Sequence, residues 1–149
     1  MRLKTFAAAA LCAAALSFAA PAIAGSVELD ITGAGGAKMS GDPEAGKTKF
    51  NQCATCHSLE AGKNKVGPTL YGIIGRVAGT VEGYNYSKAN KESGITWTEQ
   101  EMFVYLENPK AKIPGTKMAF AGLKKAEDRA NVIAYIQESY KAATAGTTP

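Results

Sequence analysis

The stretch Cys53-Ala54-Thr55-Cys56-His57 carries the clearest chemical pattern in the sequence. On a helix, two cysteines three positions apart lie one turn apart on the same face, so both thiols can reach the edge of one flat ring system. The histidine that follows places an imidazole, a common iron ligand, beside them. This spacing is typical of the site where a haem is attached through two thioether bonds. The motif therefore predicts one covalent haem c at Cys53 and Cys56, with His57 as an axial ligand of its iron.

Two other kinds of site also use a Cys-x-x-Cys pair. A closed zinc site needs four ligands, but beyond residue 24 the sequence offers only Cys53, Cys56 and His57 as cysteine or histidine ligands. A thioredoxin-like redox pair prefers the junction of a strand and a helix within a βαβ pattern. No such run of strands surrounds the motif, so the sequence favours haem over zinc and over a dithiol.

Residues 1–24 have the composition of a secretory signal peptide. Arg2 and Lys4 precede an uncharged, alanine-rich run, and Ala22-Ile23-Ala24 has the small-x-small pattern of a cleavage site. The run is shorter than the ~20 apolar residues that a membrane helix needs. We therefore expect cleavage after residue 24 and export, in a Gram-negative cell, to the periplasm, where haem is joined to such motifs.

The rest of the chain has the length of one ordinary domain. Residues 25–41 are rich in glycine, with only a short patch of alternating apolar residues, and predict a flexible leader. Residues 142–149 predict a loose C-terminal tail. The domain that holds the haem is thus expected over residues 42–141.

Three main helices must position the motif and its surroundings. The first is predicted over residues 42–56, where an N-capping Asp42 precedes a proline, and it carries the motif at its C-terminal end. The second opens with a capping box of Thr98 and Glu101 and must end before a proline at position 109. The third is expected over residues 125–141, where apolar residues recur at spacings of three and four.

Short helical turns are predicted to begin at Pro68 and Ser87, and the sequence contains no convincing series of strands. The predicted fold class is therefore all-α, with three main helices, short helical turns and loops wrapped around one covalently bound haem.

The sixth ligand of the iron must be a different residue type, because His57 is the only histidine in the chain. Met39 lies in the glycine-rich leader. Met102 fits the buried face of a helix, where methionine usually fills the core. Met118 lies in a loop between helices, which can direct a thioether to the iron without breaking a helix. Of these three methionines, Met118 is therefore favoured as the sixth ligand.

Residues 47–140 resemble the class I c-type cytochromes, and among them the bacterial cytochromes c2 and mitochondrial cytochrome c. The resemblance rests on the haem motif together with an ordered series of further matches along the chain. These are Val66-Gly67-Pro68-Thr69-Leu70-Tyr71-Gly72, Gly75-Arg76, Gly83-Tyr84-Asn85-Tyr86-Ser87, Gly94-Ile95-Thr96-Trp97, Tyr105-Leu106-Glu107-Asn108-Pro109, Ile113-Pro114-Gly115-Thr116-Lys117-Met118 and Ile133-Ala134-Tyr135-Ile136.

The resemblance implies the roles of individual residues. His57 and Met118 would be the axial pair, and the carbonyl of Pro68 would accept a hydrogen bond from the second ring nitrogen of His57. Gly46 would lie where the first and last helices cross, against Tyr135. The remaining pocket residues implied by the family are Tyr86 and Trp97 as partners of a haem propionate, Arg76 beside it, and Asn90, Tyr105 and Thr116 as a polar network next to Met118.

These assignments predict electron transfer and no enzymatic activity. A histidine and methionine pair raises the reduction potential, because the thioether favours ferrous iron. Two filled axial positions leave no room for a substrate on the iron, and the single histidine is not free for acid–base catalysis. Two alternatives remain: a haem enzyme of the peroxidase type with an easily lost sixth ligand, and a membrane-tethered cytochrome c that keeps residues 1–24 as an anchor and uses residues 25–41 as a tether.

Charge points to the kind of partner. The chain has a net charge of +4, and removing Arg2 and Lys4 leaves fifteen basic against thirteen acidic residues, so the bulk charge is a weak argument. Lysines near Met118 and the haem motif would surround the haem edge and dock on acidic redox complexes, unless they are an ordinary solvated surface.

We expect a monomer without nucleic-acid partner or membrane insertion after signal cleavage. Its partners would be a bc1-type complex or a dehydrogenase as donor and an oxidase or photosynthetic reaction centre as acceptor. The docking lysines are Lys63, Lys110, Lys112, Lys117, Lys124 and Lys125.

Overall fold

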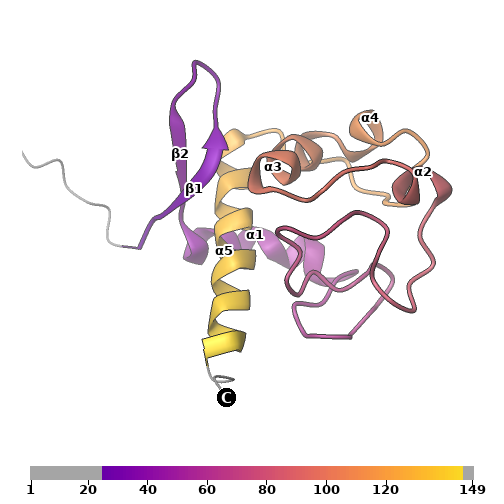
Figure 1. Ribbon diagram of the computed structural model, residues 1–149. Helices are drawn as coiled ribbons and strands as arrows, with labels where there is room; N and C mark the ends of the chain where they lie inside the picture. Colours follow the sequence, from indigo (N-terminus) through magenta and orange to yellow (C-terminus); the bar gives the residue numbers. More distant parts are fainter. Residues whose placement is uncertain (1–24, 146–149) are drawn as a thin grey trace, which may run out of the picture.

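The computed structural model describes residues 25–145, which form a mostly helical fold with one small sheet (Figure 1). The predicted signal peptide and the last four residues of the predicted tail lie outside this range. The elements are β1 (Val27–Thr32), β2 (Lys38–Gly41), α1 (Pro43–Ala54), α2 (Lys88–Lys91), α3 (Glu99–Glu107), α4 (Pro109–Lys112) and α5 (Ala126–Ala145).

Local chemistry explains how α1 begins and how it presents the motif. The carboxylate of Asp42 accepts hydrogen bonds from the backbone N–H groups of Glu44 and Ala45, at 2.8 and 3.2 Å, as predicted for an N-cap. The helix ends at Ala54, within the haem motif. The N–H groups of Cys56 and His57 both donate to the carbonyl of Cys53, at 3.0 and 2.8 Å, so a last helix-like turn holds the motif together.

The predicted capping box forms only in part: Thr98 caps α3, but its own N–H donates to the carbonyl of Thr96 at 2.8 Å and the carboxylate of Glu101 pairs with Lys112. The hydroxyl of Thr98 accepts a hydrogen bond from the N–H of Glu101 at 3.0 Å, and α3 ends at Glu107, before the proline. Ser87 caps α2 in the same way, through the N–H of Asn90 at 3.1 Å. The short helix predicted at Pro68 is absent from the described chain.

The backbone after Pro68 is held by distant partners instead of by helical hydrogen bonds. The N–H of Thr69 donates to the side-chain oxygen of Asn64 at 3.0 Å, and the N–H of Leu70 donates to the carbonyl of Ser58 at 2.8 Å. A helix that began at Pro68 would first bond the N–H of Tyr71 to the carbonyl of Gly67. That N–H instead donates to the hydroxyl of Thr69 at 3.1 Å, and the carbonyl accepts from the N–H of Lys65 at 2.9 Å. The N–H groups of Thr69 and Leu70 tie the segment to the loop that follows the haem motif.

The first and last helices cross at Gly46. A Cβ atom at this position would lie 1.9 Å from the carbonyl oxygen of Asn131 and 2.9 Å from the Cβ of Tyr135, both on α5. Any side chain would therefore push the helices apart, which explains a glycine inside α1. Beside the crossing, the rings of Phe50 and Tyr135 lie 5.3 Å apart.

The predicted flexible leader over residues 25–41 is wrong. β1 and β2 form an antiparallel hairpin in which Leu29 lies opposite Met39, and Leu29 and Ile31 are among the most buried side chains of the described chain. The apolar alternation in β1 has the period of two that is typical of a strand with one buried face. The glycines that suggest flexibility lie largely in the hairpin turn, where Gly35 has a φ of +84°.

The C-terminal boundary also differs from the prediction. α5 continues to Ala145, so residues 142–145 of the predicted loose tail are helical. The folded unit therefore extends beyond residues 42–141 at both ends.

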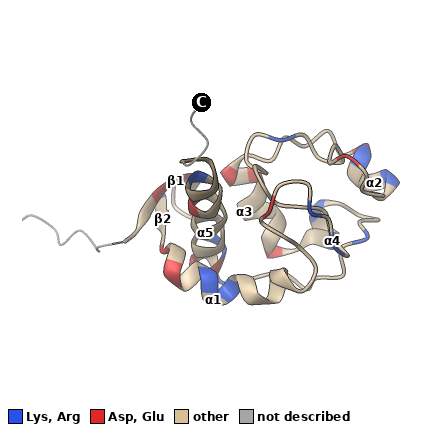
Figure 2. Cartoon of the chain, turned by 90° about the horizontal axis from the view of Figure 1, so that it is seen from below, with Lys and Arg blue, Asp and Glu red and all other residues tan. Residues whose placement is uncertain are grey.

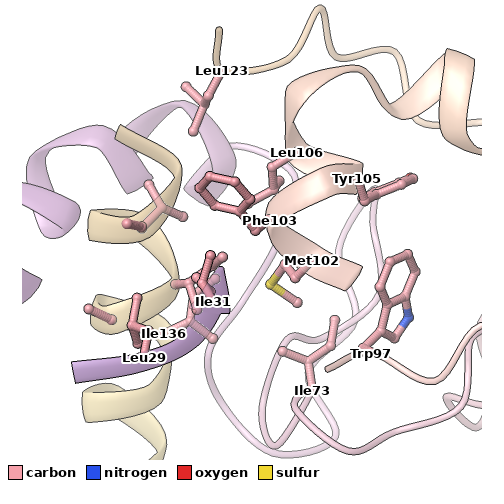
Figure 3. Packing of buried hydrophobic residues seen from close by; sticks show 14 of the residues in the cluster. Leu29, Ile31, Ile73, Trp97, Met102, Phe103, Tyr105, Leu106, Leu123 and Ile136 are labelled. Carbon is pink, nitrogen blue, oxygen red and sulfur yellow. The ribbon is translucent and has the colours of Figure 1, made fainter. Parts of the chain in front are cut away.

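The core joins the hairpin to α3 and α5. Figure 3 shows Leu29 and Ile31 of β1 beside Ile136 of α5, with Met102 of α3 on the other side of Ile31. Trp97 and Tyr105 pack against each other, with ring centroids 4.8 Å apart. The same layer of side chains thus supports the hairpin on one side and borders a cavity on the other.

Candidate haem site

A cavity of about 350 Å³ lies between the end of α1, α3, α5 and the loop 113–120. Its wall includes Cys53, Cys56, His57 and Met118. All of the pocket residues implied by the family resemblance also line it. They are Pro68, Arg76, Tyr86, Asn90, Trp97, Tyr105 and Thr116.

The imidazole of His57 is held in one orientation. Its Nδ1 lies 2.8 Å from the carbonyl oxygen of Pro68, to which the ring N–H donates, and the other nitrogen is left for a metal. Burial lowers the pKa of His57, although the bond to Pro68 opposes this effect, so the neutral form that binds iron is favoured.

Gly67 is a functional position that the sequence reasoning did not single out. A Cβ atom there would lie 2.4 Å from the Cε1 of His57, so only glycine lets the chain pass flat against the imidazole. Its place next to Pro68 in the matched segment was the signal that could have identified it.

The two motif cysteines are free and half-buried. Burial, together with the nearby thiol of Cys56, raises the pKa of Cys53 to about 11. A protonated thiol is a poor redox nucleophile. Moreover, residues 25–145 contain no group of three or more His, Cys, Asp or Glu residues that could hold a metal ion. The site therefore fits thioether attachment better than zinc or dithiol chemistry.

The thioether of Met118 lies in a defined polar setting. The hydroxyl of Tyr105 donates to its sulfur at 3.3 Å, and the hydroxyl of Thr116 accepts from its backbone N–H at 3.2 Å. Burial raises the pKa of Tyr105, which keeps the phenol protonated as a donor. Met102 also lines the cavity, but it does so from α3, where it is almost fully buried in the core.

Arg76 and Asn90 each have a polar group that could interact with a bound molecule. The guanidinium of Arg76 donates to the carbonyls of Tyr71 and Thr69, at 2.9 and 2.8 Å, but it takes part in none of the ion pairs found within residues 25–145. Burial lowers its pKa, yet an arginine keeps its charge. The side-chain oxygen of Asn90 is buried and has no hydrogen-bond partner. The half-buried cation fits a haem with anionic propionates, whereas the unpaired oxygen of Asn90 is an acceptor and requires a donor.

Among the predicted docking lysines, only Lys117 lines the cavity. Its ammonium group donates to the backbone carbonyls of Asn85 and Tyr86, at 2.9 and 3.4 Å, and ties the loop of Met118 to the segment before α2. Figure 2 shows further basic residues on α2 and α4. Those on α2 are Lys88 and Lys91, which the sequence reasoning missed although α2 borders the cavity through Asn90.

Several of the other predicted lysines are already engaged. Lys124 donates to the backbone carbonyl of Glu107 at 2.8 Å. Two more form ion pairs, Lys63 with Glu60 at 2.7 Å and Lys112 with Glu101 at 2.8 Å.

Comparison with known proteins gives consistent matches over the helical part of the chain. The family model "Cytochrome c" matches residues 43–139. The chain is 59% identical over 99 residues to cytochrome c-550 of Nitrobacter winogradskyi, covering 66% of this chain and 91% of that protein. It is 55% identical over 98 residues to cytochrome c2 of Blastochloris viridis, covering 65% and 77% of the two chains.

Among solved structures, cytochrome cH from Methylobacterium extorquens matches with a TM-score of 0.63 and 43% identity. The match covers 66% of this chain and 99% of that one. Cys53 and Cys56 fit the attachment motif through which this family binds one haem c. The chain belongs to the cytochrome c family and is a single-haem electron carrier, not an enzyme.

Proposed function

We propose that this chain carries single electrons through the periplasm, from a quinol-oxidising bc1-type complex or a dehydrogenase to an oxidase or a photosynthetic reaction centre. One observation carries the proposal: His57 and Met118 line the same cavity as the two motif cysteines. When bound, the haem supplies a one-electron couple. The protein residues attach it, orient it and exclude water from it.

The axial roles follow from how each side chain is held. The carbonyl of Pro68 orients His57, and the hydroxyl of Tyr105 binds the sulfur of Met118. Both ligands are thus positioned by partners, which favours an iron with two protein ligands over a peroxidase with an open position. Arg76, with Tyr86 and Trp97 beside it in the wall, would neutralise a propionate.

The fold of residues 25–41 argues against their use as a flexible tether. Within residues 25–145, no helix is both long and apolar enough to span a membrane. The segment expected to act as a tether, residues 25–41, is instead folded against α3 and α5, so it offers no slack. The periplasmic location rests on the signal-peptide pattern of residues 1–24.

The test is a kinetic one. The purified holoprotein should be reduced and reoxidised by membranes of its own organism, under aerobic, illuminated and anaerobic conditions compared side by side. The condition that gives fast reoxidation identifies the acceptor. Met118→Ala is the matched variant, because it should keep the haem but exchange electrons slowly. Rapid turnover of hydrogen peroxide by the unmodified protein, together with no exchange with membranes, would contradict the proposal.

The location is tested separately by cell fractionation and N-terminal sequencing. We expect the holoprotein in the periplasmic fraction with Gly25 as its first residue. A membrane-bound form that begins at Met1 would support the tethered alternative.

A further inference from the structure

The hairpin lies outside residues 43–139, the range that the family model matches, yet its first strand is bonded to a helix of the haem pocket. The backbone N–H of Asp30 donates to the carboxylate of Glu99, and the N–H of Thr32 donates to the side-chain oxygen of Gln100 at 2.7 Å. Strand edges usually leave such N–H groups to solvent. Here the first two residues of α3 accept them.

Glu99 also reaches the last helix. Its second carboxylate oxygen accepts a hydrogen bond from the side-chain amide of Gln137 on α5. One carboxylate therefore joins β1, α3 and α5.

The other end of the hairpin is fixed directly on α5. A Cβ atom at Gly41 would lie 2.4 Å from the carbonyl oxygen of Ala130, so the strand passes against the helix backbone. The next residue, Asp42, donates its backbone N–H to the side-chain oxygen of Asn131 at 2.8 Å. Between these attachments Ile31 is fully buried, next to α3 and α5 (Figure 3).

α3 in turn forms part of the cavity wall. Met102, Tyr105 and Leu106 all line the cavity. The hydroxyl of Tyr105 is the group that donates to the sulfur of Met118. Movement of α3 away from α5 would therefore withdraw the donor from that thioether.

We propose that the hairpin clamps α3 against α5, and that Glu99 and Gln100 are positioning residues that keep Met118 on the iron by way of Tyr105. This inference rests on the assignment of Met118 as the sixth ligand in the proposed function. It gives residues 26–41 a role in the redox site, although no hairpin residue lines the haem cavity.

Two substitutions in the holoprotein test the clamp. Gln100→Ala removes one hydrogen bond without changing the charge, and Glu99→Ala removes the link between three elements. Amide hydrogen exchange in α3 should become roughly two- to twelve-fold faster in Gln100→Ala, the change that corresponds to the net contribution of one hydrogen bond. On heating, the ferric sulfur–iron absorption band should be lost at a lower temperature than in the unmodified protein, while the midpoint of the far-ultraviolet helical signal shifts less.

Two further variants serve as controls. Glu99→Gln should behave like the unmodified protein. The oxygen of the new amide can accept from the backbone N–H of Asp30, and its NH2 group can donate to the side-chain oxygen of Gln137 once the amide of Gln137 has rotated by half a turn. Asp30→Asn removes the exposed pair with Lys38 but keeps the backbone N–H, so it should also leave α3 exchange and the band unchanged.

The possible results separate the clamp from the ligand assignment. Unchanged α3 exchange in both alanine variants would overturn the clamp. Equal shifts of the band and of the helical signal relative to the unmodified protein would do the same, since they indicate a merely structural role. Absence of the sulfur–iron band from the unmodified holoprotein would overturn the assignment of Met118, and the present inference with it.

Discussion

At the scale of single residues, Met118 is the side chain whose chemistry sets the reduction potential. We predict that Met118→Ala lowers the potential and abolishes the ferric sulfur–iron band, because the thioether favours ferrous iron. Met102→Ala should keep the band but lower the free energy of unfolding by about 2–5 kcal/mol, because that side chain is buried. Potentiometry, absorption spectra and denaturation of both variants check this, and the opposite pattern would make Met102 the ligand.

Arg76 combines a structural and an electrostatic role. In Arg76→Ala two backbone carbonyls lose their donor, which should cost about 1–3 kcal/mol of stability. The potential should also fall, because a nearby positive charge opposes the extra charge of ferric iron. Arg76→Lys should keep most of the potential but not the stability, since lysine lacks the fork that bridges both carbonyls. An unchanged potential in the alanine variant would mean that the charge of the guanidinium has no electrostatic effect on the iron.

At the scale of elements, the hairpin is the part of the fold that departs most from expectation. Ile31→Ala should destabilise the protein by about 2–5 kcal/mol, because its side chain is fully buried between α3 and α5. Thr32→Ala is the matched control on the same strand, and its exposed side chain should change stability by no more than about 0.5 kcal/mol. Urea denaturation followed by helical circular dichroism measures both. Equal stability of the two variants would mean that the hairpin detaches from the core in solution.

At the scale of the whole molecule, function depends on which face meets a partner. We predict that Lys110→Glu and Lys125→Glu slow association with an acidic redox partner at low ionic strength and leave the potential nearly unchanged, because neither side chain lines the cavity. The effect should shrink above 0.1 M salt, where the Debye length falls below ~10 Å. Lys38→Glu, on the hairpin and away from α2 and α4 (Figure 1), is the control with the same change of charge. Stopped-flow kinetics measure the rates, and equal slowing by all three variants would indicate that only net charge matters.

Lys63 and Lys112 are weaker members of the predicted docking set. Each is paired with a glutamate, so its charge is partly compensated before any partner arrives. The pair of Lys112 could not be predicted from the sequence, because its partner Glu101 lies on a different helix, whereas Glu60 is only three positions from Lys63.

The sequence by itself determined the features that depend on neighbouring residues. The haem motif, the N-caps at Asp42 and Thr98 and the end of α3 before a proline all rest on interactions within a few positions. The membership of the pocket was also predictable, because the family resemblance carries it residue by residue and each predicted residue lines the cavity.

Only the tertiary structure decided what depends on partners far along the chain. The alternating residues of β1 become a strand because α3 and α5, more than sixty positions away, cover one face and accept the N–H groups of its edge. The segment after Pro68 is not helical and is attached through the N–H of Leu70 to the carbonyl of Ser58, in the loop that follows the haem motif. Burial and hydrogen-bond satisfaction belong to the assembled core, so no local pattern in a glycine-rich segment can reveal them.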